Sequence, residues 1–465
     1  MADNENYELH PIKNFLEDYT GRKSIRLHMP GHKGQFGYED DITEIPGADS
    51  LYMSDGIIAA SEKKTADIFG ARRTCYGTEG SSQIIKAMCF MAVKRYYEQK
   101  GMLSKKPIIL AARNAHKSFI HASGLLEFDI KWMYSENSDD HFSICKCNLT
   151  PERVERYLVD LETEEVLDRV AAVYITSPDY LGNLLDIDGI AEVVHRHGLL
   201  LICDNAHGAY LRFLKEDLHP LSHGADIVSD SAHKTLPILT GGAYMHISHN
   251  APEGIEQSAK KAMLMFGSTS PSYMILKSLD ELTEKIKEED FIRAQKYIGE
   301  LREIVPCLEG EPFKITIPVY KFGLNGIEVF ERLRHANMEP EYADRDYVVT
   351  MWSPYNKFPV ESIWFKRMIT EIIEETKGTL EAEFADIAVK KFDCRPRVRY
   401  QPYEVLYTSS EMVEVSDSII GRVAADQLAP CPPAISPVVI GEVIDEDVVN
   451  VLKYYDVKTI EVLKN

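Results

Sequence analysis

Four short apolar runs constrain the fold of this chain more than any other feature. They cover residues 107–111, 171–176, 199–203 and 225–229. Between them lie longer segments, such as 187–197, in which apolar residues recur at helical spacing. Continuous apolar runs of this length are typical of parallel strands that are buried on both faces. The pattern therefore predicts an α/β domain with a mostly parallel sheet.

Polar residues follow each of these runs. Because open parallel sheets bind ligands beyond the carboxyl ends of their strands, we expect the chemistry of the protein to gather there. The residues are Arg113, Asn114 and His116 after the first run, Ser177 and Asp179 after the second, Asp204 and His207 after the third, and Ser231, His233 and Lys234 after the fourth.

The charge balance excludes some classes of partner. The 465 residues include 52 Lys plus Arg and 73 Asp plus Glu, which gives a net charge of −21. Such a chain repels nucleic acid and anionic membrane surfaces. Its apolar runs also fall short of the roughly 20 residues that a membrane-spanning helix needs. We therefore expect neither a nucleic-acid partner nor a membrane partner.

The N-terminus and the cysteines indicate the compartment. Residues 1–6 are polar and acidic, without the basic start and apolar stretch of a signal peptide. Cys145 and Cys147 are separated by one residue, whereas zinc and thioredoxin-like motifs separate their cysteines by two. We expect a cytoplasmic protein with reduced cysteines and without a metal site.

Changes in composition and residue pattern along the chain predict four parts. The first is rich in Pro and Gly, the second carries the four runs, and the third alternates short strand-like runs with helices. The last is Pro-rich and irregular, which suits a covering segment near a site. The parts are an N-terminal arm (1–55), a large domain (56–305), a small α/β domain (306–390) and a C-terminal covering segment (391–465).

Lys234 and Asp204 carry the sharpest chemical signal. Lys234 follows a predicted buried strand, and burial lowers the pKa of a lysine so that its amine can hold an aldehyde cofactor as a Schiff base. Asp204 directly follows the run at 199–203 and ends that predicted strand. A carboxylate that faces a pyridinium nitrogen keeps the ring able to accept electrons. Together the two residues indicate pyridoxal phosphate chemistry.

The turn Thr78-Glu79-Gly80-Ser81-Ser82 offers a cradle for the cofactor's phosphate. Small residues let backbone amides approach a phosphate, and the N-terminus of the following helix favours negative charge. The same turn also suits a plain helix cap, because Ser is common there. Ser231 and His233 could donate to the same phosphate, and for His233 a structural role in its loop is an equal alternative.

Two further histidines suit a ring-shaped cofactor. His116 lies beyond the first run, where it could stack on the ring, and His207 could support Asp204 or the cofactor. Each histidine taken alone is more often structural. Their order after successive predicted strands, together with Lys234 and Asp204, favours the functional interpretation.

Several ordered motifs resemble a known family. They are His28-Met-Pro-Gly-His-Lys33, Pro46-Gly-Ala-Asp-Ser-Leu51, the Gly80-Ser-Ser turn, Arg113-Asn-Ala-His-Lys-Ser118, Asp204-Asn-Ala-His-Gly208, Ser231-Ala-His-Lys-Thr-Leu-Pro237, Ser268-Thr-Ser-Pro-Ser-Tyr273 and Gly441-Glu442. Through them the chain resembles the ornithine/lysine/arginine decarboxylases, fold type I pyridoxal phosphate enzymes, and within that family the shorter branch without an N-terminal wing domain.

The resemblance implies an aminotransferase-like fold, with a mostly parallel seven-stranded sheet and a smaller C-terminal α/β domain. It implies that pyridoxal 5'-phosphate is bound covalently by Lys234, with Asp204 at the pyridine nitrogen, His116 stacked on the ring and His207 beside it. The other implied cofactor-binding residues are Gly80, Ser81, Ser82, Ser231, His233 and, from the neighbouring subunit, Thr269. A homodimer with shared active sites, or a higher homo-oligomer, is thereby expected.

The implied reaction is the decarboxylation of arginine, lysine or ornithine to an amine and carbon dioxide, a step of polyamine biosynthesis. Four residues depart from the family's usual pattern near the expected substrate end, namely Glu79, Asn205, Ala434 and Ser436. They leave open another fold type I reaction, such as aminotransfer, aldol cleavage or elimination, and a catalytically silent cofactor-binding protein. They also leave open whether His116, His207 or Lys234 returns the proton to the substrate.

Overall fold

The computed structural model describes residues 9–135, 147–377, 394–426 and 436–464. Two compact units divide the chain, and each is built from more than one segment. The first consists of residues 1–111, 150–177 and 186–287, and the second of residues 112–149, 178–185 and 288–465.

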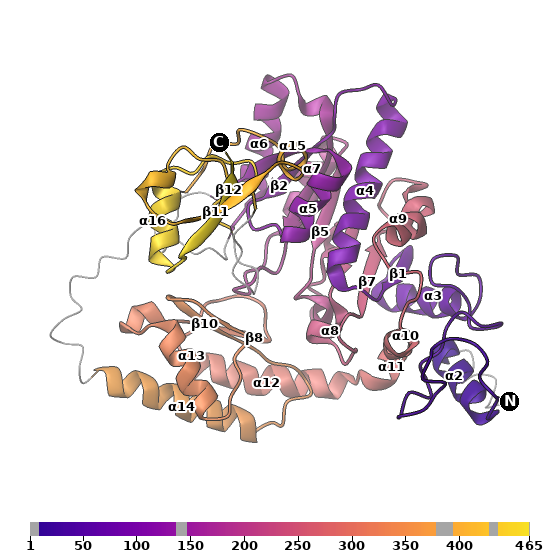
Figure 1. Cartoon of the computed structure of the whole chain (residues 1–465). Coiled ribbons are helices and arrows are strands. Elements are labelled where there is room, and N and C mark those ends of the chain that lie inside the picture. Colours follow the sequence, from indigo (N-terminus) through magenta and orange to yellow (C-terminus); the bar gives the residue numbers. More distant parts are fainter. Residues whose placement is uncertain (1–8, 136–146, 378–393, 427–435, 465) are drawn as a thin grey trace. The chain divides into compact units, whose positions relative to one another are not determined.

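A seven-stranded sheet with the strand order β1-β7-β6-β5-β4-β2-β3 forms the core (Figure 1). Strands β2, β4, β5 and β6 pair in parallel, whereas β7 runs antiparallel to both β6 and β1. The structure thus confirms the mostly parallel sheet. The strands are β1 (Arg73–Gly77), β2 (Ile108–Ala112), β3 (Asp129–Met133), β4 (Val170–Thr176), β5 (Leu200–Asp204), β6 (Ile227–Asp230) and β7 (Ala243–Ile247).

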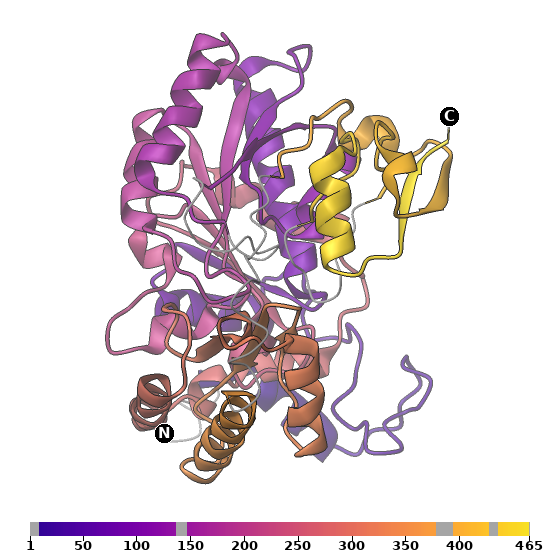
Figure 2. The ribbon, with the colours of Figure 1, turned by 90° about the vertical axis from the view of Figure 1, so that its left-hand side faces the viewer.

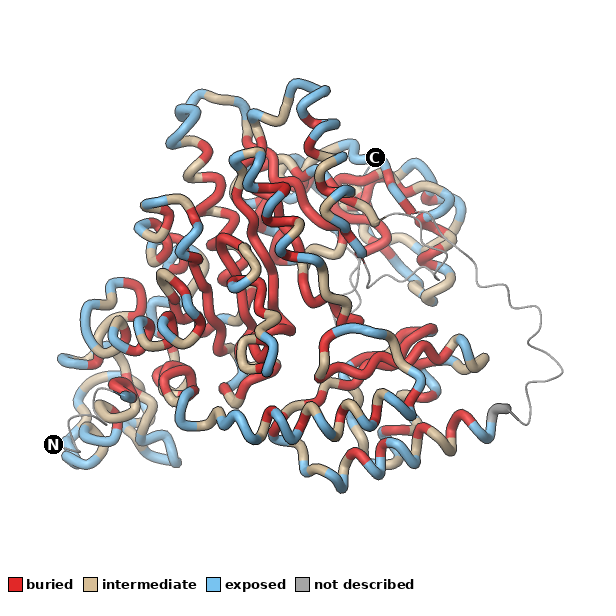
Figure 3. Tube along the Cα trace, turned by 180° about the vertical axis from the view of Figure 1, so that it is seen from behind, coloured by how far each residue is buried: buried red, intermediate tan, exposed pale blue. Residues whose placement is uncertain are grey.

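Helices pack on this sheet, as the alternating sequence pattern predicts. The long helix α4 contacts β1 and β4 to β7, and α7 contacts β5. The strands between them are buried almost throughout, which appears as the red segments of Figure 3. The α-helices of the first unit are α2 (Pro11–Gly21), α3 (Ile57–Phe69), α4 (Gly80–Lys100), α6 (Pro151–Thr163), α7 (Ile187–Arg196), α8 (Ala232–Thr235), α9 (Ala259–Met265), α10 (Tyr273–Asp280) and α11 (Leu282–Lys285).

The second unit contains two small sheets. One is a three-stranded antiparallel sheet, β8 (Lys314–Pro318), β10 (Tyr347–Met351) and β9 (Tyr342–Ala343) in that order. The other pairs β11 (Ser410–Glu414) with β12 (Thr459–Leu463), and helix α16 (Glu446–Tyr454) lies beside them in Figures 1 and 2. The other α-helices here are α5 (Lys117–Leu126), α12 (Glu288–Ile304), α13 (Gly326–His335), α14 (Val360–Lys377) and α15 (Pro402–Val405).

Short 3-10 helices complete the elements. The one that bears on the candidate site is η3 (Pro220–His223), and the others are η1 (Leu167–Arg169), η2 (Ala209–Phe213), η4 (Ile255–Ser258), η5 (Val319–Phe322) and η6 (Asp417–Ile419).

Within the described residues, every helix is too short or too polar to cross a bilayer.

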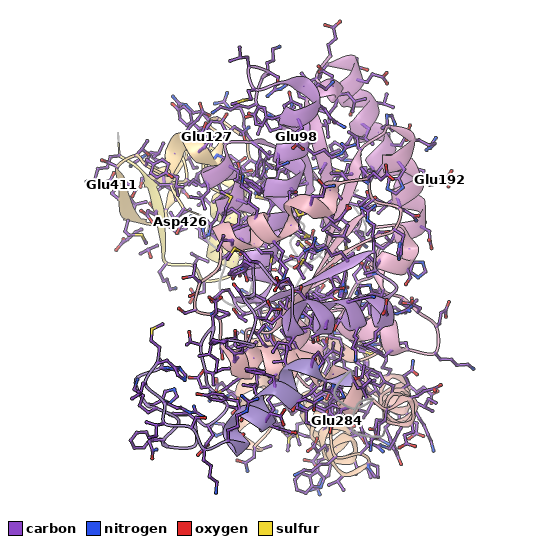
Figure 4. All side chains as sticks on the ribbon, turned by 90° about the vertical axis from the view of Figure 1, so that its right-hand side faces the viewer. Glu98, Glu127, Glu192, Glu284, Glu411 and Asp426 are labelled. Carbon is purple, nitrogen blue, oxygen red and sulfur yellow. The ribbon has the colours of Figure 1, made fainter. Side chains whose placement is uncertain are left out.

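The surface carries many acidic side chains. Exposed carboxylates are spread over elements of both units, and Figure 4 labels Glu98, Glu127, Glu192, Glu284, Glu411 and Asp426.

A buried ion pair ties two distant segments of the second unit together. The guanidinium of Arg113, which follows β2, donates to both carboxylate oxygens of Glu442, at 2.7 and 2.8 Å. Both side chains are almost completely buried, at 5% and 0% exposure. The Arg113 guanidinium also lies over the Trp132 ring, 4.9 Å from its centroid. Burial raises the pKa of Glu442, and the positive charge of Arg113 opposes that rise.

We expect Glu442→Gln to lower the free energy of unfolding by about 3 kcal/mol or more, because it leaves the Arg113 charge buried without its counter-charge. Urea denaturation followed by fluorescence measures the change. The matched control is Glu371→Gln, which breaks an exposed ion pair with Arg367 on α14 and is expected to leave the midpoint unchanged. Equal effects of the two variants would contradict a stabilising role for the buried pair.

Candidate functional site

Lys234 and His207 meet at the ends of two neighbouring strands. Lys234 lies in α8, directly after β6, and His207 lies in the turn after β5. The lysine Nζ and the histidine Nε2 are 3.1 Å apart, and the histidine is buried. A hydrogen bond at this distance requires that one nitrogen carries the shared proton and the other accepts it. The pair is therefore arranged to exchange a proton.

Asp204, the last residue of β5, is a buried carboxylate with two donors. Its Oδ2 accepts from the Tyr174 hydroxyl at 3.1 Å, and its Oδ1 accepts from the Ala206 N–H at 3.2 Å. Burial raises the pKa of Asp204 to about 6, while the nearby charge of Lys234 and the Tyr174 hydrogen bond lower it. Burial also raises the pKa of Tyr174, so that its hydroxyl keeps the proton that it donates. A cation beside Asp204 would stabilise the ionised carboxylate.

The turn between β1 and α4 has the features expected of a phosphate cradle. Gly80 has a φ of +66°, in the left-handed region that favours glycine, and its N–H donates to the Gly241 carbonyl at 2.8 Å. The Ser231 hydroxyl donates to the Ser81 hydroxyl at 2.8 Å. Thr78 Oγ1 is buried and has no hydrogen-bond partner among the described residues. The turn thus places hydroxyl groups at the N-terminus of a long helix, where the helix dipole favours an anion.

His233 lies close to the same turn. Its Nδ1 is 3.0 Å from the Gly242 carbonyl, which can only accept, so Nδ1 carries the proton. Burial lowers the pKa of His233 and favours the neutral ring. The neutral ring has no proton on Nε2, so a hydrogen bond from Nε2 to a phosphate requires the imidazolium.

Three other predicted residues are described within their own units. His116 belongs to the second unit, where it caps α5 and its Nδ1 accepts from the Ser118 N–H at 3.1 Å. Ser82 is half-buried in the first turn of α4, and Thr269 is exposed in the loop after α9. The roles of these three residues at the cofactor stay predictions.

The structure adds residues that the sequence analysis did not assign. Tyr174 lies within a continuous apolar run, so the sequence analysis did not single it out. It lies two residues before Thr176, on the same face of β4, and Thr176 pairs with Asp204. This spacing is the signal that could have identified it. Gly241 has a φ of +97°, and a Cβ there would lie 2.7 Å from the Thr78 carbonyl oxygen, so the turn requires glycine. A pair of adjacent glycines after the lysine loop is the signal for this contact.

The residues that depart from the family's usual pattern lie in different surroundings. Glu79 is exposed at the start of α4. Asn205 is buried and donates to Asp230 at 2.7 Å. Ser436 is buried in the second unit, and Ala434 lies outside the described residues.

The polar groups of the first unit fit pyridoxal phosphate. An amine, a buried carboxylate and a hydroxyl-lined helix N-terminus are the groups that such a cofactor needs at its aldehyde, ring nitrogen and phosphate. The charge of Lys234 is close enough to lower the pKa of Asp204. The buried Thr78 hydroxyl, which lacks a partner among the described residues, offers one more contact to an anion.

The raised pKa of Asp204 predicts a pH trend in the stability of the cofactor-free protein. Its folded-state pKa of about 6 lies above the ordinary 3.8, so the folded protein loses stability as pH rises through this range. Asp204→Asn removes this loss, and its melting temperature relative to wild type should therefore rise between pH 4 and pH 8. Differential scanning fluorimetry measures the trend, with Asp67→Asn on the exposed face of α3 as control. A difference that is constant with pH would contradict the shift.

Known proteins resemble this chain over most of its length. The family profile described as Orn/Lys/Arg decarboxylase, major domain, matches residues 10–296. The uncharacterized protein YaaO of Bacillus subtilis is 26% identical over 95% of this chain and 93% of its own. Arginine decarboxylase of the same species is 25% identical over 94% of this chain and 91% of its own.

Among solved structures, lysine decarboxylase A from Pseudomonas aeruginosa has a TM-score of 0.75 with 17% sequence identity. The match covers 99% of this chain and 81% of that one, and it shows a shared fold. The family profile spans more than half of the chain, across the strand ends that carry Lys234 and Asp204. The chain therefore belongs to the Orn/Lys/Arg decarboxylase family, fold type I pyridoxal phosphate enzymes that decarboxylate basic amino acids.

Proposed function

We propose that this chain decarboxylates arginine to the corresponding amine, with lysine and ornithine as the other basic amino acids to test. The observation that carries the reaction is the convergence of Lys234, His207 and Asp204 at the ends of β5 and β6. The preference for arginine rests on the relative named arginine decarboxylase, which matches nearly the full length of both chains.

In this proposal the cofactor is held at four places. Lys234 would bind it covalently, Asp204 would face the ring nitrogen, and His116 would stack on the ring. The phosphate contacts would come from Gly80, Ser81, Ser82, Ser231 and His233. When bound, pyridoxal phosphate supplies an electron sink for the bonding pair that carbon dioxide leaves behind on the substrate.

The chain's own residues would then orient the substrate and move a proton. Asp204, kept from water by its burial, holds its negative charge at one fixed point of the site. The Lys234–His207 pair carries a proton between two nitrogens 3.1 Å apart. We assign to this pair the return of a proton to Cα of the substrate, because general acid catalysis requires a donor within hydrogen-bond reach. His116 remains the alternative donor.

The wider setting is also part of the proposal. A homodimer in which Thr269 reaches the phosphate of the neighbouring subunit suits the exposure of that loop. The product amine would enter polyamine biosynthesis in the cytoplasm.

We expect Lys234→Ala to abolish the visible absorbance of protein-bound cofactor and to lower turnover by several orders of magnitude. Removal of the amine removes both the covalent link and one half of the proton-exchanging pair. Absorbance spectroscopy and carbon dioxide release measure the two effects. Lys63→Ala, at an exposed lysine of α3, is the control and should behave as wild type. Retained turnover in Lys234→Ala would remove Lys234 from its role.

We expect the cofactor-loaded protein to release carbon dioxide and agmatine in equal amounts from arginine. Incubation with arginine, lysine, ornithine and neutral or acidic amino acids, followed by mass spectrometry of the products, distinguishes the candidates. Cadaverine or putrescine would correct the substrate. A keto acid or an aldehyde as product would show that the reaction is aminotransfer or aldol cleavage and not decarboxylation. A yellow protein without any turnover would identify a silent cofactor-binding protein.

A further inference from the structure

A second acidic residue lies buried beside the candidate site, in a cluster that the mechanism above does not use. Asp230 is the last residue of β6, and its side chain is fully buried. Its Oδ2 lies 2.9 Å from Nε2 of His219 and 3.3 Å from Nε2 of His246. Its Oδ1 accepts from the side-chain amide of Asn205 at 2.7 Å. Three side chains from three other segments thus converge on one carboxylate.

The protons of this cluster can be assigned from its neighbours. Nδ1 of His219 faces the Leu221 N–H at 3.3 Å and must therefore accept, which places the ring proton on Nε2. Nδ1 of His246 lies 2.8 Å from the Thr74 hydroxyl, which can donate to it in the same way. His219 then donates to Asp230 through Nε2, whereas Nε2 of His246 faces the same oxygen at 3.3 Å without hydrogen-bond geometry.

These tautomers favour a hydrogen-bonded carboxylate over a metal site. His219, Asp230 and His246 offer ligand-type atoms within 4.8 Å of one another. A metal needs the lone pair of Nε2, which is the atom that carries the proton in His219. Burial by itself would raise the pKa of Asp230, but His219 and His246 hold it below its usual value. Burial lowers the pKa of His246 and keeps that ring neutral.

The cluster joins the two strand ends that carry the site. Asp204 and Ser229 are the last paired residues of β5 and β6. Beyond them the Asn205 N–H donates to the Ser229 carbonyl at 2.9 Å, and the Asn205 side chain reaches Asp230. Asn205 directly follows Asp204, and Asp230 directly precedes the segment from Ser231 to Lys234. The Asn205–Asp230 bond is therefore a link between the segments that carry Asp204 and Lys234.

We propose that Asp230 is a positioning residue that, through Asn205, fixes the turn after β5 against the loop after β6 and so sets Asp204 relative to Lys234. The inference rests on the proposed cofactor roles of Asp204 and Lys234. Asn205 is one of the residues that departs from the family's usual pattern, and its side-chain oxygen has no hydrogen-bond partner among the described residues. Its amide N–H is therefore the group that the contact uses.

The Asp230 carboxylate accepts from Asn205 with one oxygen and faces both imidazoles with the other. In Asp230→Asn the new NH2 turns either toward the imidazoles or toward Asn205. In the second case the Asn205 amide must rotate to accept, which buries its own NH2 where its oxygen now has no partner among the described residues. The combined variant Asn205→Asp plus Asp230→Asn restores the pattern, because the new amide at 230 donates to the new carboxylate at 205 and its oxygen accepts from His219. Comparison of the two single variants with the combined variant separates loss of the hydrogen bond from loss of the original residues.

The same strand supplies a matched control. Asp226 precedes β6 at its opposite end, and it accepts from His195 Nε2 at 3.0 Å and from the Leu201 N–H at 2.8 Å. It is a buried aspartate with a histidine partner, like Asp230, but it lies at the end of the sheet away from Lys234. Asp226→Asn therefore reports the general cost of disturbing such a pair.

The test measures cofactor affinity by absorbance titration of the cofactor-free protein with pyridoxal phosphate, and thermal stability without cofactor. We expect Asp230→Asn to weaken cofactor binding by about tenfold or more, as loss of one hydrogen bond to a buried charge would. Asp226→Asn should lower the melting temperature but leave the affinity within about threefold of wild type. The combined variant should recover the wild-type affinity within the same factor.

An affinity of Asp230→Asn within threefold of wild type would overturn the proposal, and so would an equal loss of affinity in Asp226→Asn. If Asp230→Asn fails to fold, Asn205→Ala breaks the same link from the other side, and wild-type affinity in that variant would overturn it as well. Because the readout is binding and not turnover, failure of the proposed decarboxylation is a separate result. It would appear as normal behaviour of this series together with no release of carbon dioxide.

Discussion

The parallel pairing of β2, β4, β5 and β6 is the constraint on which the candidate site depends. Parallel strands end at the same edge of a sheet, so residues that are distant in sequence come together without any long-range signal in the chain. Asp204 and the Ser231–Lys234 segment meet because β5 and β6 are neighbours in register. The antiparallel strand β7 then covers β6 and brings His246 beside Asp230.

Burial at this edge shapes the electrostatics of the first unit. Asp204 and Asp230 are both buried carboxylates, yet their surroundings move their pKa values in opposite directions. Asp204 has one hydroxyl and one backbone donor, and burial raises its pKa to about 6. Asp230 accepts from His219 and from the Asn205 amide and lies 3.3 Å from His246, and the two histidines hold its pKa below the usual value. The same residue type thus supplies two different carboxylates. An adjacent cation would favour the ionised form of Asp204, whereas the histidines around Asp230 already favour its ionised form.

Much of the fold could be predicted from the pattern of the chain. The apolar runs at 107–111, 171–176, 199–203 and 225–229 lie within one or two residues of β2, β4, β5 and β6. Strands β1, β3 and β7 were not predicted, since polar residues interrupt their apolar residues. Strand β11 was also missed, because the proline-rich composition between residues 391 and 440 favoured irregular structure, and so was its partner β12 beyond that stretch.

The sequence by itself determined the type of fold and the candidate lysine and carboxylate, because a lysine after a buried strand and an aspartate at the end of another are local patterns. Only the tertiary structure decided which side chains surround them. The Lys234–His207 contact, the Tyr174 hydroxyl on Asp204 and the cluster around Asp230 depend on strand order and register. A hydrogen bond forms only when the distance between donor and acceptor falls within a range of a few tenths of an ångström. A sequence pattern, in contrast, places a residue only on a strand, a helix or a turn.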